Sequence, residues 1–138
     1  MAPLTESRAE YMNKLCEGDV FLDTPHFNAH TTAVDAVWVG VPMITEATEK
    51  MAGRVASSIL ASAGLSLLIS RNQEDYQAMV RAVSLPGPDR QRVQSGLRDK
   101  VAAARGAPLF NSGHQPSQSS LVDLCACRHS LYGNVWHP

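Results

Sequence analysis

The stretch from Leu22 to Pro42 reads LDTPHFNAHTTAVDAVWVGVP, and it predicts a strand, a loop, a helix and the start of a second strand. The compact apolar run that ends at Leu22 is typical of a buried parallel strand. Small and polar residues gather where the helix begins, at Thr31, and Gly40 is placed to end that helix. This alternation of strands and helices indicates an α/β fold with a parallel sheet.

The start of the predicted helix favours an anion. The first N–H groups of a helix have no partner within the helix and carry a partial positive charge, so they can bind a phosphate. Asp35 follows Thr31 by four residues and Thr32 by three, which places all three on one helical face. A carboxylate would then lie one turn from the phosphate, within reach of a sugar hydroxyl. The pattern predicts a site for a nucleotide-sugar diphosphate.

Two simpler interpretations stay open when the helix is considered alone. His30, Thr31 and Thr32 could form an N-cap cluster, in which each capping residue stabilises the helix by about 1 kcal/mol. Asp35, in a helix otherwise filled with Ala, Val and Trp, could lie on the exposed face. The helix sequence alone therefore does not distinguish capping from ligand binding, and the flanking residues are needed to separate the two interpretations.

Length and composition narrow the class of protein. The chain has 138 residues, of which 44% are hydrophobic, and this is enough for one domain with a core. Its formal net charge of −1 does not favour nucleic acid or an anionic membrane as a partner. No apolar run reaches the ~18 residues that a transmembrane helix needs. Three cysteines are an odd number, and a reducing, intracellular compartment is the simpler interpretation.

The rest of the chain predicts more helices than strands. We expect helices over residues 5–17, 52–63, 73–83 and 89–105, a second strand over 41–45, a short turn or strand over 65–70 and a terminal helix over 121–136. Thr5 is the expected N-cap of the first helix. Residues 1–110 should form a partial lobe, with an irregular tail over 111–138. Two clear strands are too few for a free-standing sheet, so the chain reads as the last part of a larger lobe.

A longer pattern surrounds the opening stretch. It consists of Leu22-Asp23-Thr24-Pro25, Asn28, His30-Thr31-Thr32, Asp35, Trp38, Gly40, Pro42, Glu49, Ala52 and Arg54-Val55. This pattern resembles the C-terminal catalytic region of the O-GlcNAc transferases, the UDP-GlcNAc:protein N-acetylglucosaminyltransferases that include SPINDLY-like members and have the GT-B fold. The resemblance extends over nearly the whole chain and implies a partial Rossmann-like lobe, with few parallel strands and several helices.

The resemblance also implies roles in donor binding. In that family the matching His and two Thr hold the donor diphosphate, and the matching Asp holds the ribose. These roles fall on His30, Thr31, Thr32 and Asp35. A helix upstream of the first strand also binds the nucleotide in the family, and the matching positions here are Arg8, Tyr11 and Lys14. Tyr11 replaces a His that lies against the uracil base, and its aromatic ring could stack there.

Besides Tyr11, the chain departs from the family in its sequence after the second strand and in its extent. Ala47-Thr48-Glu49 replaces Pro-Gly-Glu, and Ala52-Gly53-Arg54-Val55 replaces Ala-Ser-Arg-Val. The tetratricopeptide repeats, the N-terminal lobe and the first half of the C-terminal lobe have no counterpart here. The Lys that binds the diphosphate oxygens and the candidate acid/base residues belong to those parts of the family. We therefore expect no catalytic residue in this chain and little or no activity from it alone.

The implied function is that of a C-terminal fragment of a glycosyltransferase. It would move N-acetylglucosamine from UDP-GlcNAc to Ser or Thr of proteins in the cytoplasm and/or nucleus, with no cofactor and no metal. The partners would be a UDP-sugar and, through the missing regions, protein acceptors. One alternative is a relative that transfers fucose from GDP-fucose, although that subgroup tends to have Gly-Thr-Thr-Thr-Thr-Cys-Glu in place of His30 to Asp35. The other is a non-catalytic, truncated remnant.

Other polar residues have weaker claims to a function. Asp23 is expected to close the turn after the first strand through bonds to the backbone. His26 could face the same cleft, Glu49 is a candidate donor contact, and Arg54 is expected to bind an acidic neighbour or stay solvated. Cys125-Ala126-Cys127 with His129 lacks the spacing of a structural zinc site.

Overall fold

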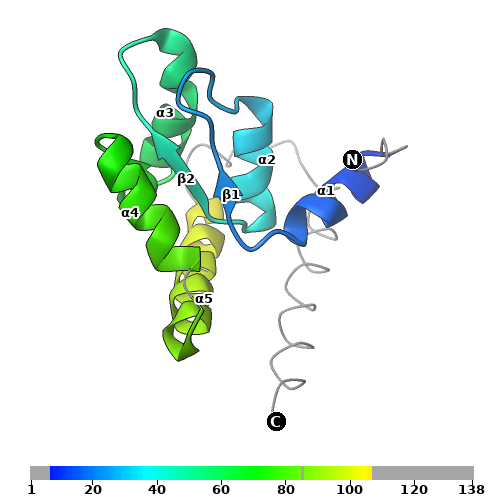
Figure 1. The fold of residues 1–138 in the computed structure, drawn as a ribbon. Coiled ribbons are helices and arrows are strands. Elements are labelled where there is room, and N and C mark those ends of the chain that lie inside the picture. Colours follow the sequence, from blue (N-terminus) through cyan, green and yellow to red (C-terminus); the bar gives the residue numbers. More distant parts are fainter. Residues whose placement is uncertain (1–6, 85, 107–138) are drawn as a thin grey trace.

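The computed structural model describes residues 7–84 and 86–106, and these form an α/β structure (Figure 1). In chain order the elements are α1 (Arg8–Cys16), β1 (Phe21–Leu22), α2 (Thr31–Val39), β2 (Met43–Glu46), η1 (Met51–Gly53), α3 (Val55–Ser62), η2 (Ser66–Leu68), β3 (Ile69–Ser70), α4 (Gln73–Ser84), α5 (Pro88–Ala103) and η3 (Ala104–Gly106). The α/β prediction is confirmed. The helix expected over 121–136 and the tail over 111–138 lie outside the described residues.

The sheet of the described region is parallel, with the order β1-β2-β3. Phe21 pairs with Met43 and Leu22 with Ile44. Thr45 pairs with Ile69, so the segment expected to be a turn or strand supplies a third strand. Helix α2 connects β1 to β2, and α3 connects β2 to β3. The carboxyl ends of the strands therefore share one edge of the sheet, and the loop that begins at Asp23 lies on that edge.

The main core lies between the sheet and the helices α2, α3 and α5. Its buried members include Ala33 and Val37 from α2, Met43 from β2, and Leu60 from α3. Val101 near the end of α5 joins the same cluster and is fully buried. Helix α4 contacts β2 and β3 (Figure 1). Helix α2 is thus held on several sides, which fixes the position of its first turn.

Helix α1 begins at a capping box and packs on α2. Its N-cap is Ser7, not Thr5 as expected. The Ser7 hydroxyl accepts from the Glu10 N–H at 3.2 Å, and Glu10 accepts from the Ser7 N–H at 3.2 Å. This reciprocal pair explains the later start, because it satisfies two backbone donors at once. Met12 shares a buried hydrophobic cluster with Ala36 of α2, and this cluster joins the two helices.

The cysteine prediction needs a correction at the end of α1. Cys16 is disulfide-bonded, which the odd number of cysteines did not favour. An odd number of cysteines leaves at least one thiol unpaired, but it does not prevent two of the three from forming a disulfide.

The burial predicted for the first strand is wrong at its last residue. Leu22 is 50% exposed, and Phe21 is only partly buried. Strand β1 is at the edge of the described sheet, so it hydrogen-bonds on one side only. The Phe21 N–H donates to Pro42 at 2.8 Å and the Asp23 N–H donates to Ile44 at 3.0 Å. Side chains alternate between the two faces of the sheet: Phe21 packs against both clusters of the core, and Leu22 lies on the other face, where it lines a groove with Val83 and Gln94.

Helix α2 ends as predicted at Gly40, which has a left-handed φ of 85°. A side chain there would be strained and would also meet Arg105, because a Cβ would lie 2.8 Å from Nη2 of that residue. The Val41 N–H donates back to Ala36 at 2.9 Å and closes the turn. Glycine therefore serves two purposes at this position, chain reversal and close approach of a guanidinium.

Within the described residues, no helix has both the length and the apolar character needed to cross a membrane.

Candidate functional site

The loop after β1 is organised by Asp23, whose side chain is almost fully buried. Its Oδ1 accepts from the Ala29 N–H at 2.7 Å, and its Oδ2 accepts from the Thr45 hydroxyl at 2.6 Å. The Tyr76 hydroxyl donates to the Asp23 carbonyl at 2.8 Å. Burial, helped by the charges of Asp23 and Glu46, raises the pKa of the Tyr76 phenol, which keeps it protonated as a donor. The predicted structural role of Asp23 is confirmed.

The rest of this loop is folded by its own side chains. The Thr24 hydroxyl donates to the Phe27 carbonyl at 2.5 Å, and the Asn28 amide donates to the Thr24 carbonyl at 2.9 Å. The Asn28 N–H donates to Ala52 at 2.8 Å and so connects the loop to η1. The chain therefore reaches His30 along a defined path.

The first turn of α2 is open to a ligand. His30 is its N-cap residue, with φ −101° and ψ −91°, and the imidazole makes no capping hydrogen bond. The His30 carbonyl accepts from the Ala33 N–H at 3.1 Å. Among the described residues, the N–H groups of Thr31 and Thr32 have no acceptor. The interpretation of these side chains as a simple N-cap cluster therefore fails for His30, and the two N–H groups can bind an anion.

Asp35 lies one turn further along α2 and is paired with α1. The Arg8 Nη2 donates to Asp35 Oδ1 at 2.8 Å, and the Asp35 side chain is only 7% exposed against 58% for Arg8. The interpretation of Asp35 as an exposed-face residue is therefore wrong, because α1 covers that face of α2. The structure brings two predicted site residues together across a separation of 27 positions.

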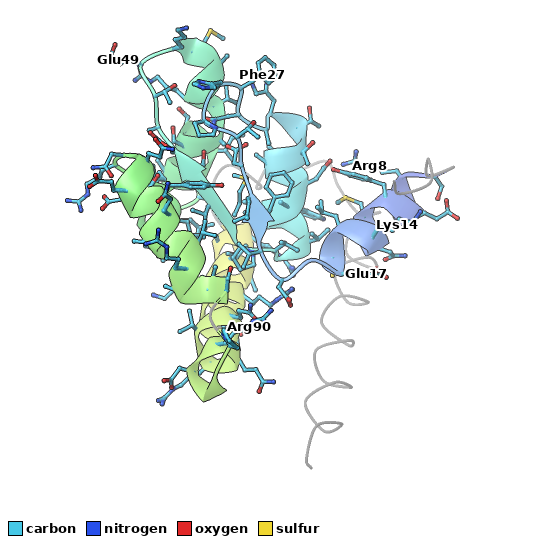
Figure 2. The ribbon with its side chains drawn as sticks, viewed as in Figure 1. Arg8, Lys14, Glu17, Phe27, Glu49 and Arg90 are labelled. Carbon is cyan, nitrogen blue, oxygen red and sulfur yellow. The ribbon has the colours of Figure 1, made fainter. Side chains whose placement is uncertain are left out.

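The other two residues predicted on α1 lie differently. Tyr11 is partly buried and packs against the cluster that contains Met12 and Val39. Lys14 is exposed, and Figure 2 shows it apart from Arg8 on α1. Of the three residues predicted on this helix, Arg8 makes the hydrogen bond to a polar side chain of α2.

Phe27 is a neighbour of the site that the sequence analysis did not single out. Its ring stacks on the His30 imidazole, with centroids 5.1 Å apart and planes inclined by 17°. The signal in the sequence is an aromatic residue three positions before a histidine, in a loop that also contains Thr24 and Asn28. This signal is weak, because only the conformation of the loop brings the two rings face to face.

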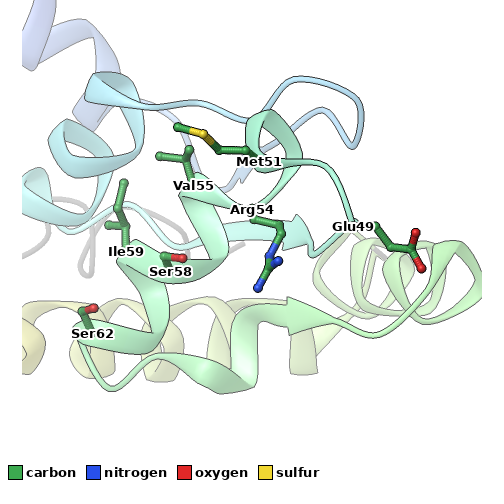
Figure 3. A pocket seen from close by; sticks show the side chains of 7 residues that line it. All are labelled: Glu49, Met51, Arg54, Val55, Ser58, Ile59 and Ser62. Carbon is green, nitrogen blue, oxygen red and sulfur yellow. The ribbon is translucent and has the colours of Figure 1, made fainter.

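A separate groove lies along α3 and has a volume of about 520 Å³ (Figure 3). Its lining consists of Glu49, Met51, Arg54, Val55, Ser58, Ile59 and Ser62. No residue of α2 lines it, so Glu49 and Arg54 belong to a different surface from His30. Arg54 is exposed, in agreement with the solvated alternative.

The described residues contain no group of three His, Cys, Asp or Glu side chains that could hold a metal ion. Cys125, Cys127 and His129, which were weighed as metal ligands, lie outside these residues.

A parallel α/β lobe with an uncapped helix start after its first strand defines a class of domains that can bind phosphate at that edge. Comparison with known proteins narrows this class. Residues 5–118 match the model of glycosyl transferase family 41, and the chain belongs to this family.

Two relatives illustrate the similarity. The chain is 39% identical over 106 residues to the probable UDP-N-acetylglucosamine–peptide N-acetylglucosaminyltransferase SEC of Arabidopsis thaliana, a match that covers 76% of this chain and 10% of the relative. It is 33% identical over 133 residues to the UDP-N-acetylglucosamine–peptide N-acetylglucosaminyltransferase of Caenorhabditis elegans, covering 94% of this chain and 10% of the relative. The chain therefore spans about a tenth of the length of these proteins.

A solved structure of an O-GlcNAc transferase is also similar to this chain. A mutant of the Thermobaculum terrenum O-GlcNAc transferase matches with a TM-score of 0.67 and 28% identity, over 94% of this chain and 23% of that one. This match confirms the prediction of a partial C-terminal lobe of a GT-B glycosyltransferase.

Proposed function

We propose that this chain forms part of the donor site of a protein O-GlcNAc transferase. The complete enzyme would transfer N-acetylglucosamine from UDP-GlcNAc to a Ser or Thr hydroxyl of a protein. Membership of family 41 and the names of the relatives support this reaction class. Because the chain spans about a tenth of those relatives, catalysis requires the regions that they have in addition.

The observation that carries the proposal is the open first turn of α2. The N–H groups of Thr31 and Thr32, together with the His30 imidazole, would hold the diphosphate of the donor. When the sugar leaves, negative charge grows on that diphosphate, and donors fixed in advance stabilise it without reorganisation. No metal is needed for this part of the reaction, and we propose none.

The part-buried pair of Arg8 and Asp35 would complete the nucleoside side of the site. Asp35 would accept a hydrogen bond from the ribose, while Arg8 donates to its other oxygen and faces solvent. Tyr11 and Lys14 are proposed for the base, with Tyr11 stacking and Lys14 supplying charge. Both residues belong to α1, whereas His30 precedes α2, so their roles can be tested separately from that of His30.

Calorimetric titration of the 138-residue chain with UDP tests the proposal. We expect binding by the wild type and roughly tenfold weaker binding by His30→Ala, the loss of about one charge-assisted hydrogen bond. Lys100→Ala is the control, because Lys100 is an exposed residue near the end of α5, outside the loop and α2. Its affinity should equal that of the wild type. An absence of heat at millimolar UDP, with His30→Ala behaving alike, would contradict nucleotide binding by this segment alone.

The same titration with GDP separates the donor alternatives. The proposal requires that UDP binds more tightly than GDP. Tighter binding of GDP would favour the GDP-fucose alternative instead.

A further inference from the structure

The ring of Phe27, which stacks on His30, is unusually exposed for a large apolar side chain. Phe27 is 65% exposed and belongs to neither hydrophobic cluster of the described core. A large apolar side chain contributes to stability mainly when it is buried, so the core does not explain this ring. Its partner is the imidazole at a centroid distance of 5.1 Å.

The backbone on both sides of Phe27 is fixed. Its carbonyl accepts from the Thr24 hydroxyl at 2.5 Å. The next residue, Asn28, is bonded through its N–H to Ala52 and through its amide to Thr24. The loop therefore presents the Phe27 ring at one place beside the start of α2.

His30 lacks any other restraint on its side chain. Its imidazole makes no capping hydrogen bond and no ion pair within residues 7–84 and 86–106. A histidine at a helix start would otherwise sample several rotamers. Contact between two nearly parallel rings reduces that freedom and excludes water from one face of the imidazole.

We propose that Phe27 is a positioning residue, which holds the His30 imidazole beside the open N–H groups of Thr31 and Thr32. The inference rests on the proposed role of His30 in binding the donor diphosphate. With the imidazole already in place, less conformational freedom is lost when the ligand binds. Stacked aromatic pairs change an equilibrium constant by about threefold to tenfold, and we expect this effect on diphosphate affinity.

The stack itself is tested by proton NMR of the full chain, without a ligand. A ring current from Phe27 should move the carbon-bound imidazole protons of His30 upfield, and a His30→Gln variant assigns these resonances. Phe27→Leu should return them toward the position of an unstacked histidine, whereas Phe27→Tyr should retain the shift. Identical His30 resonances in the wild type and Phe27→Leu would overturn the proposal.

The positioning role is tested by calorimetry with UDP on the same variants. Phe27→Leu should bind UDP about threefold to tenfold more weakly, and Phe27→Tyr should bind like the wild type. Leu67→Ala is the control, because Leu67 is an exposed apolar residue of η2, at the opposite edge of the sheet. Its affinity should not change, and its thermal unfolding measures the cost of losing an exposed apolar group.

The outcomes separate this inference from the proposed function. If the wild type and Phe27→Leu bind UDP equally, Phe27 does not position His30, while the proposed function stands. If the wild type does not bind UDP, the proposed function of the isolated chain fails and the positioning role fails with it. Weaker binding by Phe27→Leu that Phe27→Tyr restores supports both.

Discussion

Helices α2 and α3 start at the same edge of the sheet, yet their first turns differ in chemistry. Both follow a parallel strand, and neither has a side-chain cap. Helix α2 begins at an exposed imidazole and two threonines, whereas α3 begins at Arg54 and continues through Val55 to the fully buried Ala56. An uncapped helix start is therefore not a site by itself. The side chains around it decide whether an anion can approach.

The approach to each helix is also held by a different contact. The loop before α2 is held by the buried carboxylate of Asp23. The turn before α3 depends on Gly53, where a Cβ would lie 2.6 Å from the Pro25 carbonyl. One junction relies on hydrogen bonds and the other on the absence of a side chain. The two junctions also touch each other, because Pro25 belongs to the loop before α2 and the Asn28 N–H donates to Ala52 in η1.

The largest effect on stability is expected from Asp23→Ala. It leaves the Ala29 N–H and the Thr45 hydroxyl without their acceptor in a buried setting. The free energy of unfolding should fall by about 2–4 kcal/mol, measured by urea denaturation. Asp99→Ala, at an exposed position of α5, is the control and should change it by no more than about 0.5 kcal/mol. Equal midpoints for both variants would mean that the loop before α2 does not depend on Asp23.

Gly53→Ala tests the turn before α3. The new Cβ would meet the Pro25 carbonyl, so the backbone before α3 must shift, at an expected cost of about 1–3 kcal/mol. Gly96→Ala is the matched control, because nothing lies within 4 Å of a Cβ built at that position. That variant should gain about 0.5–1 kcal/mol, since alanine favours a helix interior over glycine. Thermal unfolding should move in opposite directions for the two variants, and a shared direction would contradict the crowding at Gly53.

The ion pair between Arg8 on α1 and Asp35 on α2 gives a further test of what holds the start of α2. Arg8→Ala leaves the nearly buried Asp35 without its cation, and we expect a loss of about 1 kcal/mol. A double-mutant cycle with Asp35→Asn should give a coupling of at least about 0.5 kcal/mol. The control is Arg71→Ala, which breaks an exposed ion pair with Asp75 on the surface and should cost less. Zero coupling between Arg8 and Asp35 would show that the carboxylate does not need this partner.

The smallest effect on stability is expected when a carboxylate is placed at either helix start. His30→Asp should stabilise α2 by about 0.5 kcal/mol, since an acidic side chain favours the positive end of a helix. The same charge should abolish UDP binding in calorimetry. Arg54→Asp introduces a carboxylate at the start of α3 and should leave UDP affinity unchanged. Loss of binding in both variants would remove the distinction between the two helix starts.

Local patterns predicted much of this fold. The order of strand, helix and strand from Leu22 to Pro42 is present, α2 covers its predicted residues, and Gly40 ends it. These features depend on periodicity and on the conformational freedom of one glycine, which neighbouring residues reveal. The start of α1 was misplaced although its signal is local, because the Ser7 and Glu10 pair was not weighed against Thr5.

Features that depend on distant contacts could not be predicted in this way. The partner of Asp35 is 27 positions away, on a helix whose packing only the folded chain defines. The exposure of Leu22 depends on which face of the sheet its side chain takes and on what packs there, and apolar character alone does not encode it. The stack of Phe27 on His30 depends on three hydrogen bonds in the loop. The resemblance identified the residues at the start of α2, but not what surrounds them.

The close approach of Arg105 to Gly40 has an electrostatic consequence for α2 as a whole. A guanidinium at the end of a helix offsets the partial negative charge of its last carbonyl groups. The opposite end, at His30, carries no acidic residue in its first turn. An anion that approaches α2 therefore meets the positive end of the helix dipole, while a guanidinium lies at the opposite end. A residue larger than glycine at position 40 would displace that cation and weaken the field.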